Sequence, residues 1–212
     1  MHHSILAALV VIVCGGCATT PATPPPGGVQ ADVDFPSPGT RWVTRTTDQS
    51  GAVSTITFTA LEEGVHEGKP VYRLSDGADI RVFDKATRNF VASLRDRKER
   101  MAASPHDGTL SSPLWVGRSW RSTYTLHNRD RGRSDTVGVS WKVEAYEDVT
   151  VPAGTFKAFK LVSTPGMNNA SYYTIWFAPD PGLVVKQIYE RTPQHLMGPG
   201  KFTTELMELT RK

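Results

Sequence analysis

The sequence predicts a mostly β protein: a single antiparallel sheet, strongly curved or bent into a half-barrel, with a β-sandwich as the alternative. Three observations predict this class. Apolar and polar residues alternate along most of the chain, which is the period of a strand. Connections rich in Gly, Pro, Asn and Asp are too short for the crossovers of parallel strands. Several strands are apolar on both faces, so they need cover on both sides.

An export signal opens the chain. Residues 5–13 are all apolar; this run is too short to span a bilayer but typical of a secretory signal peptide. The following sequence VCGGC, residues 13–17, resembles a bacterial lipobox. Cys17 fits the acylated position because two small glycines precede it, whereas bulky Val13 precedes Cys14. The resemblance implies a lipoprotein acylated at Cys17 with chains such as palmitate.

The same segment predicts where the protein resides. A lipoprotein signal implies export to the envelope of a Gram-negative-type bacterium. Ala18 follows the cysteine in place of the Asp that retains lipoproteins at the inner membrane, so the resemblance favours the outer membrane. Cys14 and Cys17 also spell a redox CxxC, but a redox motif needs a strand-to-helix context that this segment lacks. No other cysteine is present, so the body of the chain holds no disulfide.

The chain divides into three parts. We expect a lipoprotein signal peptide over residues 1–16 and a β domain over residues 39–212. Between them, residues 17–38 comprise the lipidated cysteine and a proline-rich tether, whose composition favours an extended spacer over a packed core.

Strands follow one another through the β domain, nine to eleven of them. The alternation predicts strands at residues 41–47, 53–60, 70–74, 79–83, 90–95, 120–126, 137–145, 156–163, 171–177, 184–191 and 201–209. Only residues 96–103 (DRKERMAA) combine good helix formers. We therefore expect at most one or two short helices.

Three motifs carry a family resemblance. They are residues 113–120 (PLWVGRSW), 149–160 (VTVPAGTFKAFK) and 175–186 (IWFAPDPGLVVK). Their order resembles a group of β-rich bacterial envelope proteins that includes the TapB-like proteins and relatives of the LolA-like half-barrel of lipoprotein carriers. The resemblance covers about residues 110–190 and implies the fold; it implies no catalytic motif. Turn-forming Pro152 and Gly154 also explain the second motif structurally.

Catalytic and metal signatures are missing from the sequence. The histidines of the β domain stand alone, without metal-ligand spacing, and neither a GxSxG elbow nor a phosphate-binding glycine loop occurs. With 212 residues, 39% apolar and 21% charged, and a net charge of +3, the chain suits one compact domain. We therefore expect no enzyme, no cofactor, no metal and no nucleic-acid partner.

Two functions remain, both based on non-covalent binding. The first is a structural or interaction module at the outer membrane, anchored by lipid and docking to another envelope protein. The alternative is a periplasmic carrier or chaperone that holds a lipid, an acyl chain or another apolar ligand in a concave β face. The aromatic residues expected to line that face are Trp120, Tyr124, Trp141, Tyr172 and Trp176. Simple core packing would also explain aromatic residues at alternating positions.

Overall fold

The computed structural model describes residues 23–212, which are all-β with no helix. The strands in chain order are β1 (Gln30–Ala31), β2 (Arg41–Asp48), β3 (Val53–His66), β4 (Lys69–Ser75), β5 (Ile80–Asp84), β6 (Phe90–Arg95), β7 (Lys98–Ser104), β8 (Leu114–Trp115), β9 (Ser119–Asn128), β10 (Arg133–Val151), β11 (Gly154–Pro165), β12 (Ser171–Ala178), β13 (Leu183–Arg191) and β14 (Gly200–Thr210). Within residues 23–212, no helix is long and apolar enough to cross a membrane. Cys17 and the signal peptide lie outside the described residues.

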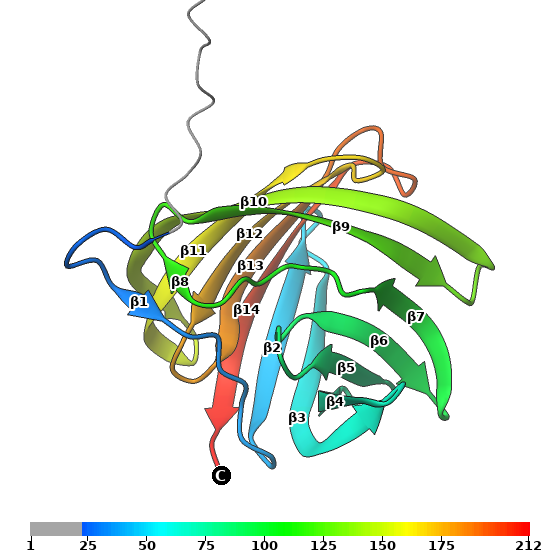
Figure 1. The fold of residues 1–212 in the computed structure, drawn as a ribbon, viewed down its shortest axis with the longest axis horizontal. Helices are drawn as coiled ribbons and strands as arrows, with labels where there is room; N and C mark the ends of the chain where they lie inside the picture. Colours follow the sequence, from blue (N-terminus) through cyan, green and yellow to red (C-terminus); the bar gives the residue numbers. More distant parts are fainter. Residues whose placement is uncertain (1–22) are drawn as a thin grey trace, which may run out of the picture.

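Twelve of these strands form a closed antiparallel barrel (Figure 1). Their order is β10-β11-β12-β13-β14-β2-β3-β4-β5-β6-β7-β9, and β9 returns to β10. The prediction of an open curved sheet or half-barrel, and the alternative of a sandwich, are therefore wrong. The closed wall covers the inner apolar face of the two-sided strands, whereas their outer face stays outside the barrel, as at Tyr172, which is 49% exposed.

The barrel closes where its last strand, β14, pairs with its first, β2. Strand β7 occupies the segment expected to be helical. Asp96 and Arg97 take positive φ values of 50° and 64°, which turn the chain back on itself. Residues 98–104 then pair with β6 on one side and β9 on the other, for example Ala102 with Ala92 and with His127. Tertiary pairing therefore overrides the helix propensity of DRKERMAA.

The N-terminal segment belongs to the packed structure. β1 pairs with β8, Gln30 opposite Trp115, and Figure 1 shows the chain running on from β1 toward the start of β2. Val33 is only 2% exposed within a core cluster of the barrel, and the Phe35 ring stacks on Tyr72 at 4.4 Å. The packed chain therefore begins near Gln30, inside the stretch that its composition assigns to the tether.

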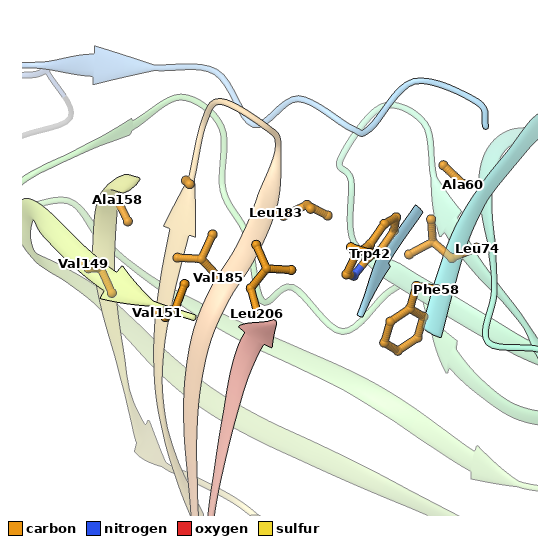
Figure 2. Close-up of a cluster of buried hydrophobic side chains, with 11 residues drawn as sticks. Trp42, Phe58, Ala60, Leu74, Val149, Val151, Ala158, Leu183, Val185 and Leu206 are labelled. Atoms are coloured by element: carbon orange, nitrogen blue, oxygen red, sulfur yellow. The ribbon is translucent and has the colours of Figure 1, made fainter. Parts of the chain in front are cut away.

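Buried apolar side chains close one end of the barrel. Figure 2 shows them gathering from strands on both sides of the barrel; they include Trp42, Phe58, Leu74, Val149, Val151, Leu183, Val185 and Leu206. We call this the apolar end; the β12–β13 turn lies there, between Ala178 and Leu183.

Candidate functional site

A partly enclosed cavity of about 780 Å³ occupies the barrel interior, a volume within the range of small-molecule sites. Side chains of eleven strands line it, together with two segments outside the barrel wall, residues 33–36 and the loop between β7 and β8. The barrel therefore encloses a cavity as well as a packed core.

The cavity lining changes in character along the barrel. On β2 the inward positions are Trp42, then Thr44, then Thr46; on β14 they are Leu206, then Thr204. The hydroxyls of Thr46 and Thr204 share a hydrogen bond of 2.8 Å, while Trp42 and Leu206 belong to the apolar end. The cavity is therefore apolar at its base and polar further along, which suits an amphipathic occupant.

A row of aromatic rings crosses the polar part of the inner wall. This aromatic row consists of Trp120, Trp141, Tyr173, Tyr189 and Phe202. Successive ring centroids are 6.4, 6.2, 4.8 and 5.7 Å apart. The row follows the strand register, in which Trp141 lies opposite Trp120, and Tyr189 lies opposite both Tyr173 and Phe202. Because neighbouring rings pack on one another, their polar tips are held in place.

The loop between β7 and β8 lies against the inner face of β9. The Trp120 Nε1–H donates to the Gly108 carbonyl at 2.9 Å, and the Ser122 hydroxyl donates to the Asp107 carbonyl at 3.2 Å. These two bonds hold the loop inside the barrel. As a result, the Asp107 side chain forms part of the cavity wall.

Burial sets the protonation of this wall. The Asp107 carboxylate accepts hydrogen bonds from the Thr109 hydroxyl at 2.8 Å and the Phe90 N–H at 3.2 Å. Desolvation outweighs these bonds and raises the pKa of Asp107 above its usual range. Desolvation, with a smaller contribution from the Asp107 charge, raises the pKa of Tyr124 to about 12. Desolvation and the neighbouring Tyr189 also raise the pKa of Tyr173, so both phenols are neutral donors at physiological pH.

Trp141 presents a buried donor without a partner. The residue is 4% exposed, and its Nε1–H meets no hydrogen-bond acceptor among residues 23–212. The indoles of Trp120 and Trp176, by contrast, donate to the Gly108 carbonyl and to Glu147. A buried donor costs free energy unless an acceptor reaches it, so Trp141 marks where a ligand acceptor would be stabilised.

The structure separates the five aromatic residues singled out in the sequence. Tyr124 and Trp141 line the cavity, and Trp120 packs beside Trp141 in the aromatic row. Tyr172 and Trp176 lie on the outer face of β12, where Tyr172 is 49% exposed and the Trp176 indole bonds to Glu147.

Sequence reasoning missed several cavity residues, namely Tyr173, Asp107, Thr44 and Thr46. The signal for Tyr173 was present, because it alternates in step with Ile175 and Phe177, whereas Tyr172 and Trp176 share the opposite face. Asp107 lies in a loop without periodicity, so only the folded chain reveals its position.

A second cluster of potential ligands lies outside the barrel interior. Atoms of His66, Glu67 and Glu99 approach within 4.8 Å of one another, beside a smaller depression of about 260 Å³. One Glu99 oxygen already pairs with Arg129 at 2.9 Å, and the other lies 3.9 Å from His66. We describe this group as a charge cluster and assign no metal to it.

Comparisons with known proteins are distant. No family model and no curated protein matches the chain. Among solved structures, a candidate lipoprotein from Parabacteroides distasonis aligns over 83% of this chain and 97% of its own, at 14% identity and a TM-score of 0.44. A candidate exported protein with a YmcC-like fold from Bacteroides fragilis aligns over 85% and 100%, at 11% identity and a TM-score of 0.45.

The hypothetical lipoprotein YmcC from Escherichia coli also aligns, over 82% of this chain and 90% of its own, at 11% identity and a TM-score of 0.41. None of the three is described as a TapB-like or LolA-like protein. At these TM-scores, any functional conclusion has to rest on the residues of this chain.

Proposed function

We propose that this chain is an exported, lipid-anchored protein of the bacterial envelope that binds an apolar ligand in its barrel without catalysing a reaction. The observation that carries the proposal is the cavity of about 780 Å³ between the apolar end and the aromatic row. Burying apolar ligand surface there is favourable at about 25 cal/mol per Å². A carrier or chaperone for a lipid or acyl chain is the role that this geometry supports best.

The anchor and location in this proposal come from the sequence. The lipobox at Cys17 supports acylation, and Ala18 favours the outer membrane. The resemblance of residues 110–190 to proteins related to LolA-like lipoprotein carriers also favours a carrier. The membrane is therefore one partner of the protein and the apolar ligand a second.

An interaction module is the second candidate, supported by a different surface. Met167, Leu196 and Met197 are 59%, 75% and 63% exposed. They lie in the β11–β12 and β13–β14 loops, which share one end of the barrel because the strands are antiparallel. Exposed apolar side chains gathered at one end favour contact with another envelope component.

Native mass spectrometry with organic extraction tests the proposal. The probe is the chain carrying Cys17→Ser, so that acyl chains on the anchor are not mistaken for ligand. We expect a stoichiometric apolar adduct, or its return when extracted envelope lipid is added back. Thr44→Trp should abolish the adduct by filling the cavity, because Thr44 lines it.

The control is Thr57→Trp, the same substitution at an exposed position on β3, which should leave the adduct unchanged. A bare protein mass before and after lipid is added back would contradict the proposed ligand binding. It would leave the interaction module as the better candidate.

A further inference from the structure

We infer that the ligand is an amphiphile with an uncharged polar head group, which contacts Tyr124, Trp141 and Tyr173 while its apolar part points toward the apolar end. This inference rests on the proposed function and specifies the class of ligand. It follows from the direction of the cavity, the donors in its polar part and the desolvation of its wall.

The direction of the ligand follows from the two kinds of lining. The base is formed by side chains such as Phe58, Leu74 and Leu206, which offer no hydrogen bond. A hydroxyl, ester or amide placed there would lose its hydrogen bonds to water without replacement, which is unfavourable. The head group is therefore favoured at the other end, beside the aromatic row.

The polar part of the cavity offers neutral hydrogen-bond donors. Trp141 has the unpartnered Nε1–H, and its ring lies 6.2 Å from Tyr173. Tyr124 and Tyr173 add two phenolic hydroxyls to the same cavity, of which the Tyr173 hydroxyl is also hydrogen-bonded to Tyr189. Both stay protonated because burial raises the pKa of each. Neutral donors of this kind suit the carbonyl and hydroxyl oxygens of an ester or alcohol.

Desolvation in the wall disfavours an anionic head group. Asp107 lines the cavity, and its carboxyl accepts hydrogen bonds from neutral donors of Thr109 and Phe90. Burial nevertheless disfavours its charged form and raises its pKa. A ligand carboxylate in the same part of the cavity would face the same loss of hydration, so it would have to take up a proton or remain charged without water.

The basic residues of the cavity wall are already engaged. Arg81 pairs with Asp76 at 3.2 Å and its guanidinium lies 4.9 Å from the Phe58 ring. Arg88 donates to the carbonyls of Lys85 and Ala86, although its Nε has no partner among the described residues. Within the described wall, Arg88 is therefore the basic residue with a donor left for a ligand carboxylate. Binding of a carboxylate there would contradict this inference.

Equilibrium binding of two lipids with the same acyl chain tests the inference. Radiolabelled 1-monopalmitoylglycerol and palmitate are compared near neutral pH on the chain carrying Cys17→Ser. Monopalmitoylglycerol should bind about tenfold more tightly, because desolvation that raises the pKa of a ligand carboxyl by one unit weakens the binding of its charged form by that factor.

Variants of the donors complete the test. Tyr173→Phe should weaken monopalmitoylglycerol binding about fivefold, the effect of one neutral hydrogen bond, and Trp141→Phe should do the same. If Trp141→Phe destabilises the core, Tyr173→Phe still tests the donor set. Tyr172→Phe is the matched control, because this neighbouring tyrosine is exposed on the outer face, and binding should not change.

The outcomes separate the inference from the proposed function. Palmitate binding as tightly as monopalmitoylglycerol, or more tightly, would overturn the uncharged head group but preserve ligand binding. Loss of that palmitate binding in Arg88→Gln would then assign the head group to Arg88. Binding of neither lipid would overturn the proposed function together with the inference.

Discussion

Gly108 shows how a single residue places a loop inside the barrel. Its φ is +63°, in the left-handed region that favours glycine. A Cβ at this position would lie 2.0 Å from the Ser122 Oγ, the hydroxyl that holds the neighbouring Asp107 carbonyl. The absence of a side chain therefore allows the loop to approach β9 and brings the Asp107 carboxyl into the cavity wall.

Gly108→Ala should destabilise the fold by about 2–4 kcal/mol, combining a left-handed backbone cost of about 1 kcal/mol with displacement of the loop. Urea unfolding measures the change. Gly132→Ala is the control, because Gly132 has a φ of +58° but open space around it, so it should lose only about 1 kcal/mol. Equal losses in both variants would show that the loop does not depend on the contact with Ser122.

Single residues also show which features of the candidate site the sequence predicts and which it does not. Alternation separates the inner from the outer face of β12, but it does not state which face borders the cavity. That choice depends on the opposite wall, to which Trp42 and Phe58 contribute. Tyr124 and Trp141 could therefore be selected from the sequence only together with outward-facing Tyr172 and Trp176.

At the scale of elements, the segment from Gln30 to Pro38 is part of the cavity wall. It pairs with β8, and the Val33 N–H donates to the Ser112 hydroxyl at 3.1 Å. Val33 and Phe35 line the cavity. This segment links the barrel to the part of the chain that contains Cys17.

Removing residues 30–38 should therefore destabilise the barrel. Burial of Val33 and Phe35 contributes about 1.5–3 kcal/mol for each side chain, so a chain beginning at Gly39 should lose several kcal/mol. A chain beginning at Gln30 should unfold at the same urea concentration as one beginning at Thr23. Equal stability of the chains that begin at Gln30 and Gly39 would show that the segment is dispensable.

Most strands could be predicted, because each carries its own alternation. The eleven predicted strand runs all coincide with strands of the structure. β1 and β8 contain two residues each, too few for any period to appear. β7 resembles a helix in composition, and its pairing with β6 and β9 decides its conformation.

At the scale of the whole molecule, barrel closure could not be predicted. An open sheet and a closed barrel show the same alternation along each strand. Closure depends on the last strand, β14, meeting the first strand of the barrel, β2, with Thr210 opposite Arg41. No local pattern encodes such a pairing, and the cavity exists only because the wall closes.

The anchor is tested on the intact protein. Cys17→Ser should abolish incorporation of labelled fatty acid and flotation with membranes, because the acylated sulfur is lost. Cys14→Ser should preserve both, since Cys14 precedes the expected cleavage site. Continued acylation of the Cys17→Ser protein would contradict the lipobox assignment.

Pairing of β1 with β8 also sets the length of chain between the barrel and the proposed anchor. For a chain acylated at Cys17, the connecting segment ends at Gln30, where β1 begins, and not at Gly39. An extended chain over residues 18–29 covers at most about 40 Å, and a turn that joins Gly28 to Pro25 at 2.9 Å shortens it. An anchor at Cys17 would therefore keep the barrel within about 40 Å of the membrane surface, and a proposed lipid donor or acceptor would have to come within that distance.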